Sequence, residues 1–104
     1  MRTNLAVKIV RYVDDHQPGW VEVEFVDAQG QRHIFVDKVP GFTSVRLDAH
    51  SSYPQPGQVA CEVLSRSQDT LGRTLVSITT ARPYHIESTE GASEFVVLPS
   101  QLST

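Results

Sequence analysis

Apolar and polar residues alternate along most of this chain, which is the period of a β-strand. The clearest run is 21–25, where Val21, Val23 and Phe25 alternate with two glutamates. Because successive side chains of a strand point to opposite faces, this run predicts an antiparallel strand with one buried and one solvated face. Similar periods predict strands over residues 5–13, 31–39, 59–66, 73–80 and 94–98, whereas the irregular segment 42–58 predicts a short strand plus a loop.

Two segments carry the same turn signature, Asp27-Ala28-Gln29-Gly30 and Asp69-Thr70-Leu71-Gly72. Each lies between two alternating runs. An aspartate at the first turn position can accept hydrogen bonds from the backbone two residues further on, and a glycine at the fourth position tolerates a positive φ. The sequence therefore predicts two β-hairpins.

Helices are expected to be absent apart from one helical turn at 99–102, because no window keeps apolar residues at helical spacing without a breaker. Short strands without a covering helix must close into a barrel or stack as two sheets. We therefore expect one all-β domain over residues 1–104, a small antiparallel β-barrel of about six strands and of SH3-like or OB-like size. Its long first strand would bend and serve both halves of the barrel. A two-sheet β-sandwich is the alternative.

Composition narrows the function classes. The chain has 104 residues, a formal charge of −3 and nine cationic side chains spread along its length. Nucleic-acid binding draws most of its affinity from clustered Lys and Arg, so we expect no nucleic-acid partner. No apolar stretch approaches the ~18 residues of a membrane helix, so we expect no membrane association and a cytoplasmic protein. The single cysteine, Cys61, has the parity of Val59 and Val63 and is expected to be a buried, inert thiol.

The residue types of catalysis and metal binding are present but not at the required spacings. The four histidines are His16, His33, His50 and His85, and no two have the close spacing of metal-ligand pairs. His50 beside Ser51 and Ser52 lacks the geometry of a nucleophile and its base. Glu22 and Glu24 share a strand face, which is also the ordinary way to keep a strand soluble. The glycines are isolated, so no phosphate cradle is formed. We expect no catalytic site, no metal site and no cofactor.

The ending Val97-Leu98-Pro99-Ser100-Gln101-Leu102 resembles the last strand and helical turn of SH3-like barrels, where a Pro-Ser pair follows a strand. The resemblance covers six residues and implies a barrel of that kind at this end of the chain. The acidic and aromatic peptide-binding motifs of signalling SH3 domains have no counterpart here, so the resemblance does not imply binding of proline-rich peptides.

The segment Arg82–Gly91 combines aromatic, cationic and acidic residues in a connection between two predicted strands. Loops on a rigid β scaffold often carry binding residues, and Tyr and Arg are frequent at interface hot spots. The candidate binding residues are Arg82, Tyr84, His85 and Glu87 of this loop, together with Trp20 and Tyr53, which lie next to breakers. The alternative is that the aromatic residues only cap the ends of the barrel.

The absence of catalytic sets favours a non-enzymatic protein-binding or accessory module, whose partner is a protein held through this loop. One version is an inhibitor or immunity-type protein, because an acidic domain suits a basic target. The alternative function is a small ligand-binding or enzymatic barrel, in which Arg82, His85 and Glu87 surround a cavity. The chain is expected to be a monomer, or a homodimer joined along strand edges.

Overall fold

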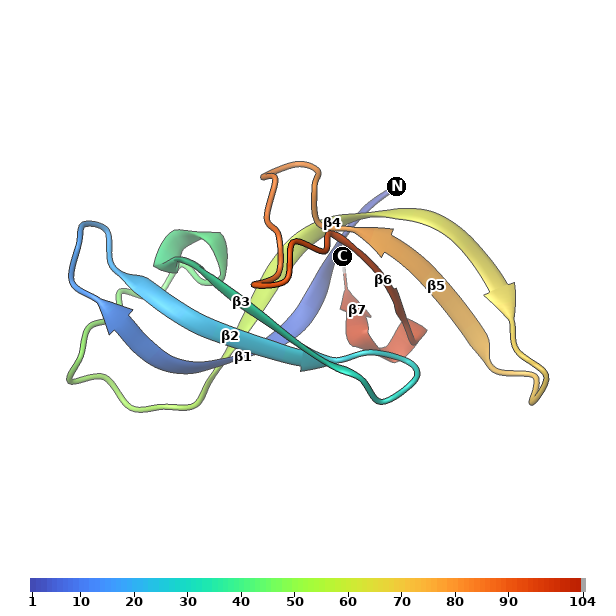
Figure 1. Ribbon diagram of the computed structural model, residues 1–104, viewed down its shortest axis with the longest axis horizontal. Coiled ribbons are helices and arrows are strands. Elements are labelled where there is room, and N and C mark those ends of the chain that lie inside the picture. The colour runs from blue at the N-terminus through green and yellow to red at the C-terminus, as the bar shows by residue number, and fades with distance from the viewer. Residues whose placement is uncertain (104) are drawn as a thin grey trace.

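The computed structural model describes residues 1–103 as a single antiparallel sheet that curls into a half-barrel (Figure 1). Its elements are β1 (Arg2–Asp14), β2 (Trp20–Val26), β3 (Arg32–Lys38), the 3₁₀ turn η1 (Val39–Gly41), β4 (Gln55–Gln68), β5 (Thr74–Thr79), β6 (Glu94–Val97), the 3₁₀ turn η2 (Pro99–Gln101) and β7 (Leu102–Ser103). The strand order is β3-β2-β1-β4-β5-β6, and β7 pairs with β1. The prediction of an all-β fold of about six strands is confirmed, and the two-sheet alternative is wrong because one continuous sheet holds every strand.

Strand β1 joins the two halves of the fold, as its predicted length indicated. Its first part, from Arg2 to Ile9, pairs with β4, and its second part, from Lys8 to Asp14, pairs with β2. Register shifts interrupt the pairing with β2 after Ile9 and after Tyr12. Such bulges bend a strand and increase its twist, which allows one strand to serve two differently oriented halves.

The core lies on the concave side of the sheet and is built from the apolar positions of the alternating runs. Leu5, Ile9, Val21, Val23 and Phe35 are fully buried there. At the middle of the half-barrel the rings of Phe25, Phe35 and Phe95 contact one another, with centroids 5.2–5.8 Å apart. Edge-to-face contacts of this kind stabilise a core beyond the area they bury.

Both predicted hairpin turns are confirmed in detail. Asp27 and Asp69 each accept, through Oδ1, two backbone N–H groups of their own turn at 2.9–3.0 Å. Gly30 and Gly72 have φ angles of 84° and 83°, which require glycine. The two turns close the β2–β3 and β4–β5 hairpins.

The two edges of the sheet are bridged by loops. Ala28, in the β2–β3 turn, donates its N–H to the carbonyl of Val96 on β6 at 2.9 Å. Thr89, in the β5–β6 connection, donates to the carbonyl of Ile34 on β3 at 2.8 Å. Because these contacts occupy edge groups, the open side of the half-barrel is covered by turns instead of by a strand ladder.

Two local predictions are corrected. Segment 42–54 contains no strand, and the strand expected within 42–58 is the beginning of β4 at Gln55. A 3₁₀ turn forms at Val39–Gly41, where the sequence predicted only the end of a strand. Proline is pre-organised for the first turn of a helix, and Pro40 occupies that place in η1 as Pro99 does in η2. The predicted turn after the last strand is confirmed by η2. Within residues 1–103, neither of these turns is long and apolar enough to cross a membrane.

Candidate functional site

The connection between β5 and β6 is anchored in the core by Thr80. Thr80 is fully buried, and its hydroxyl donates to the carbonyl of Ile86 at 2.6 Å. The N–H of Ile86 in turn donates to the carbonyl of Thr80 at 2.9 Å. The side chain of Ile86 is buried as well. These two hydrogen bonds hold Thr80 and Ile86 together, so residues 81–85 form a short loop between two buried residues.

Ser88 fixes the second half of the same loop. Its backbone N–H donates to the carbonyl of Ala92 at 2.7 Å, and its hydroxyl accepts the N–H groups of Glu90 and Ala92. With Thr89 bonded to β3, the loop is held at both ends and across the sheet edge. It is therefore an ordered part of the scaffold, which reduces the entropy cost of presenting side chains to a partner.

The predicted binding residues of this loop point in different directions. Arg82 donates through Nε to Oε1 of Glu62 on β4 at 3.1 Å. His85, at a positive φ of 55°, has Nε2 3.4 Å from Oε1 of Glu87, and both side chains are exposed. Tyr84 is 68% exposed. Arg82, His85 and Glu87 thus lie on an open surface and do not surround a cavity.

Tyr84 borders a shallow depression of about 310 Å³, which we call the Tyr84 groove. Its other lining residues are Asp37, Lys38, Pro40, Gly41 and Ile86. Trp20 lies beside the groove, because it is the cross-strand partner of Lys38 and its ring centroid is 5.8 Å from the Lys38 Nζ atom. Lys38 is therefore related to two of the predicted residues, since it lines the groove with Tyr84 and its ammonium lies over the Trp20 ring.

Tyr53 does not join this surface. It is half-buried against the core, and its hydroxyl donates to the carbonyl of Asp48 at 2.7 Å. Segment 42–54, which carries it, passes beneath the β1–β2 end of the half-barrel (Figure 1). Tyr53 is thus placed where an aromatic residue closes the end of the core.

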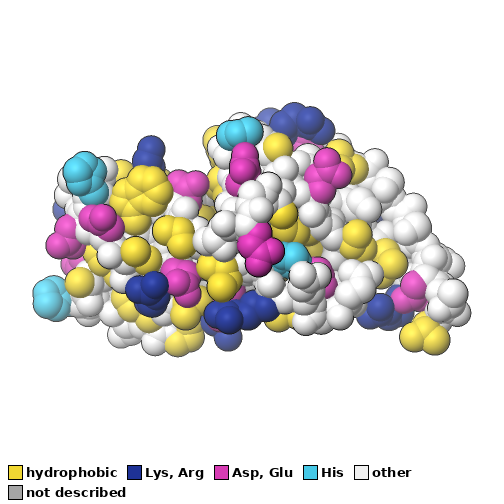
Figure 2. Space-filling model, viewed as in Figure 1, with side chains coloured by type: hydrophobic (Ala, Val, Ile, Leu, Met, Phe, Trp, Pro, Cys, Tyr) yellow, Lys and Arg dark blue, Asp and Glu magenta, His cyan; other side chains and the backbone are white. Residues whose placement is uncertain are grey.

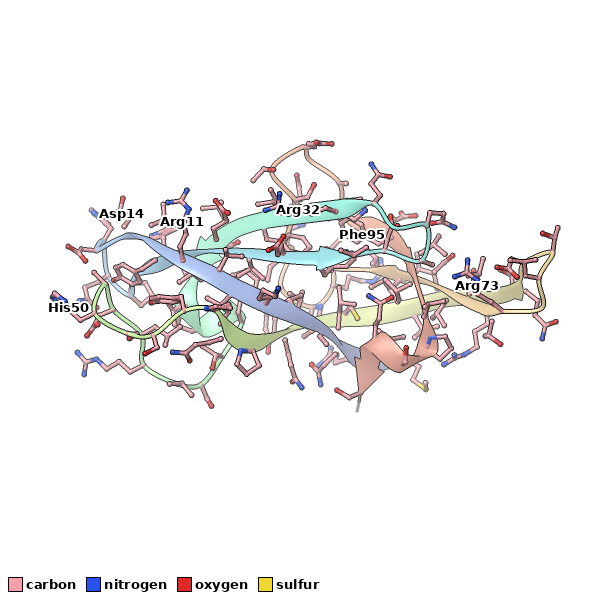
Figure 3. The ribbon with its side chains drawn as sticks, turned by 90° about the horizontal axis from the view of Figure 1, so that it is seen from below. Arg11, Asp14, Arg32, His50, Arg73 and Phe95 are labelled. Atoms are coloured by element: carbon pink, nitrogen blue, oxygen red, sulfur yellow. The ribbon has the colours of Figure 1, made fainter. Side chains whose placement is uncertain are left out.

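The outer face of β1, β2 and β3 is covered by ion pairs. Glu22 pairs with Arg11 at 3.0 Å, and Glu24 pairs with Arg32. Arg11 and Arg32 lie on the outer side of the sheet (Figure 3). In the view of Figure 2, acidic and basic side chains are interspersed and no extended patch of one charge is formed. The two glutamates are therefore half-buried partners of exposed arginines.

A half-buried Asp–His pair is the feature that the sequence did not reveal. Nε2 of His33 lies 2.7 Å from Oδ2 of Asp27, and the two side chains are 15% and 9% exposed. The His33 ring packs against Phe25 and Phe95, with centroids 5.2 and 4.7 Å away. Burial by itself raises the pKa of Asp27. The hydrogen bonds that the carboxylate accepts from His33, Gln31 and Gln29 together lower this pKa by more than burial raises it, so the net shift is downward.

The hairpin register carried the signal for this pair. A hairpin turn at Asp27–Gly30 sets the pairing of β2 with β3, in which His33 lies opposite Phe25 and close to Asp27. Ser77 lines the same depression of about 300 Å³ as Asp27 and His33. Within residues 1–103 no hydrogen bond joins Ser77 to His33, so the order of a catalytic triad is not formed. The pair is a structural contact between turn and core.

The remaining candidate chemistry is accounted for by turn structure. Asp48 accepts the backbone N–H of His50 at 2.8 Å, and its own N–H donates to the hydroxyl of Ser51 at 3.0 Å. In the described part of the chain, no group of three or more His, Cys, Asp or Glu side chains is placed to hold a metal ion. Cys61 is fully buried, and burial raises its pKa to about 11.

No protein-family model, no curated protein and no solved structure matches this chain.

Proposed function

We propose that this protein is a non-enzymatic protein-binding module that contacts its partner through the Tyr84 groove. The observation that carries the proposal is Tyr84 itself, a large aromatic side chain that is 68% exposed on a loop pinned by buried Thr80 and Ile86. An exposed aromatic on a rigid support can bury a large area on binding at a small entropy cost. Trp20 and Lys38 extend the contact surface on one side.

The charges around the Tyr84 groove favour a partner that fits its shape over a partner that is attracted by net charge. Asp37 and Lys38 line the groove with opposite charges, and the whole chain carries only −3. An inhibitor of a strongly basic target would present a coherent acidic face, which this groove does not have. The proposal includes a cytoplasmic location, because the chain has one buried thiol and no second cysteine for a disulfide.

The ligand-binding or enzymatic alternative has less support. It needs Arg82, His85 and Glu87 around one cavity, whereas Arg82 is engaged by Glu62 and the other two pair with each other on the surface.

The proposal is tested with a matched pair of exposed apolar positions, Tyr84 and Leu71. Leu71 is 84% exposed at the tip of the β4–β5 hairpin, at the far end of the molecule from the β1–β2 end. A photo-crosslinking phenylalanine analogue at position 84 or 71 is expressed in the native host, and adducts are identified by mass spectrometry. Tyr84→Ala and Leu71→Ala are then compared for affinity to the protein so identified.

The proposal expects one discrete adduct from position 84 and none from position 71. Tyr84→Ala should weaken binding at least ~10-fold, the effect of a hot-spot residue of about 1.4 kcal/mol, while Leu71→Ala leaves it unchanged. The same adduct from both positions, or no adduct from position 84, would overturn it. The mass of the purified protein in solution separates a monomer from a homodimer joined at this surface.

A further inference from the structure

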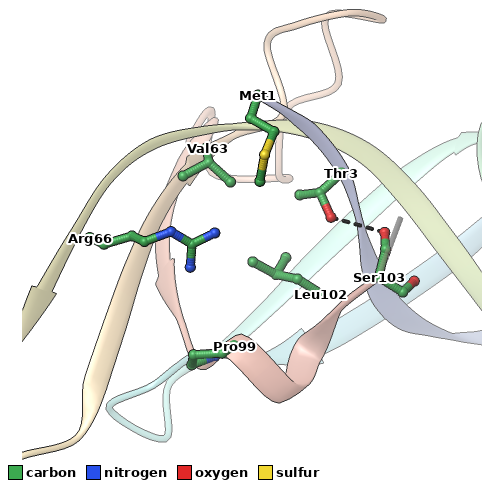
Figure 4. Close-up of a pocket in the computed structure, with 7 residues that line it drawn as sticks. All are labelled: Met1, Thr3, Val63, Arg66, Pro99, Leu102 and Ser103. Atoms are coloured by element: carbon green, nitrogen blue, oxygen red, sulfur yellow. Dashed lines mark hydrogen bonds between the residues drawn. The ribbon is translucent and has the colours of Figure 1, made fainter.

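A second surface feature, the hollow beneath the β4–β5 hairpin, shares no residue with the Tyr84 groove. It has a volume of about 440 Å³, which is within the range of small-molecule sites. Met1, Val63, Pro99 and Leu102 supply apolar walls. Figure 4 shows these side chains around the hollow, with β4 above it and η2 and β7 below. The hollow is the open end of the concave side of the sheet.

The guanidinium of Arg66 points into this hollow (Figure 4). The reason is the register of β4 and β5. Val63 lies opposite Ile78, and after an irregularity at Leu64 the pairing resumes with Ser65 opposite Ser77 and Arg66 opposite Val76. Directly opposed residues of an antiparallel pair point to the same face, and Val76 and Ile78 are both buried in the core. Arg66 is therefore on the concave face.

Among residues 1–103, Arg66 has no carboxylate partner, unlike most other arginines. Four arginines bind carboxylates directly: Arg11, Arg32, Arg73 and Arg82. Within residues 1–103 Arg66 has no such partner, and the hollow is lined by no Asp or Glu. A guanidinium presents a fork of N–H donors that matches a carboxylate. In the described part of the chain, the hollow thus combines a guanidinium that no carboxylate binds with apolar walls.

Two hydroxyl groups lie at the edge of the hollow, and both are engaged within the protein. Thr3 is buried and donates through Oγ1 to the carbonyl of Ser103 at 2.9 Å. The Ser103 hydroxyl oxygen lies 3.5 Å from Nε2 of Gln58, from which it accepts. In Figure 4 the guanidinium of Arg66 enters the hollow from one side, and the Ser103 oxygen that accepts from Thr3 lies on the other. Arg66 is therefore the cationic donor that faces the hollow.

We propose that this hollow binds a carboxylate carried on a short apolar chain, with the head group on Arg66 and the chain against Val63, Leu102 and Met1. The apolar walls select against small inorganic anions, which offer nothing to bury. The absence of acidic lining residues selects against cationic ligands. Two sources share this chemistry: a free aliphatic acid and the apolar C-terminal residue of a peptide.

The test is titration of the ¹⁵N-labelled full chain followed by NMR. The probes are octanoate, octan-1-ol with the same chain but no charge, and N-acetyl-leucine beside its amide. The variants are Arg66→Gln and, as a control, Arg46→Gln, because Arg46 is also exposed and lies in the 42–54 loop away from the hollow. Both replace exposed side chains, and resonances of the core report that each variant is folded.

We expect saturable shifts at the amides of Thr3, Val63 and Leu102, with a dissociation constant on the order of millimolar for a ligand of this size. Arg66→Gln should weaken the binding of octanoate at least ~10-fold, and octan-1-ol should bind the wild-type protein as weakly as octanoate binds this variant. Arg46→Gln should not change the binding of octanoate. If N-acetyl-leucine binds more tightly than octanoate and its amide does not bind, the site is assigned to peptide C-termini. Shifts that do not saturate, or that are equal in Arg66→Gln or with octan-1-ol, would overturn the proposal.

Discussion

His33 and Asp27 connect the first hairpin turn to the aromatic core through a single carboxylate. Oδ1 of Asp27 accepts the N–H groups of Gln29 and Gln31, and Oδ2 lies 2.7 Å from Nε2 of His33. His33 in turn packs against Phe95 of β6. Asp69 holds the second turn in the same way but has Arg73 as its side-chain partner. The first turn is therefore tied to the aromatic core, whereas the second reaches the rest of the fold through Arg73, whose Nη2 donates to the carbonyl of Ala28 in the first turn at 3.4 Å.

Stability should decline in acid in a way that depends on Asp27. In the folded protein the pKa of Asp27 lies below the ordinary 3.8. The contribution of this carboxylate to the free energy of unfolding is therefore complete above pH 3.8, and it is lost as the pH falls through the pKa of the folded state. Urea unfolding at pH 7, 5, 4 and 3 should show Asp27→Asn less stable at pH 5–7, with the gap to wild type narrowing in acid. Asp15→Asn, at an exposed position, is the control. A gap that is constant from pH 7 to pH 3 would contradict this role.

Thr80→Val should loosen the loop between β5 and β6. Valine keeps the volume but removes the hydroxyl that donates to Ile86 at 2.6 Å, leaving a buried carbonyl with one fewer partner. We expect a loss of ~1–3 kcal/mol in the free energy of unfolding and faster hydrogen exchange at the Ile86 amide. Thr70→Val at an exposed turn position should change stability by less than ~0.5 kcal/mol. Unchanged exchange at Ile86 would show that the loop is held by other contacts.

Gly57 is where β4 passes closest to the core, and it should not accept a methyl group. A Cβ there would lie 3.0 Å from the side chain of Ile9 and 3.1 Å from the carbonyl oxygen of Phe42. We expect Gly57→Ala to destabilise by ~1–3 kcal/mol in thermal or urea unfolding. At Gly41 the nearest atom is 3.6 Å away, so Gly41→Ala serves as the tolerant control. Equal effects at the two positions would rule out the steric explanation.

Adding Ile9→Val to Gly57→Ala gives a sharper form of that test. Ile9→Val removes Cδ1, one of the two Ile9 atoms that lie 3.0 Å from the new methyl group, and keeps Cγ1. The double variant should be more stable than the sum of the two single effects predicts, because the second change relieves part of the first. Strict additivity would assign the cost to the contacts that remain, with Cγ1 of residue 9 and with the Phe42 carbonyl.

Cys61 should be unreactive in the folded protein. It has no exposed surface, and burial raises its pKa to about 11, so the reactive thiolate is scarce at neutral pH. Ellman's reagent at pH 8 should label the native protein only as fast as it unfolds, and should label it completely in urea. Stability should also fall as the pH rises above 9.0, the ordinary pKa, because the unfolded thiol ionises first. Labelling of native protein at the rate of a free thiol would contradict this burial.

The sequence by itself determined the local elements. The alternation around Val21 fixed one strand, and the Asp27–Gly30 and Asp69–Gly72 turns fixed two hairpins, because these features depend on backbone geometry within a few residues. The length of β1 indicated that one strand would serve both halves. Pro99 indicated the last helical turn. Each of these predictions needed no knowledge of distant contacts.

Only the tertiary structure decided where the side chains of the sites point. Simple alternation from Val63 would place Arg66 on the outer face, but the irregularity at Leu64 reverses the parity and turns Arg66 into the hollow. Tyr84 lines one groove with Lys38 because η1 and the β5–β6 loop meet there. Bulges and sheet curvature depend on packing over the whole molecule, and for this reason the strands were predictable from the sequence but their functional surfaces were not.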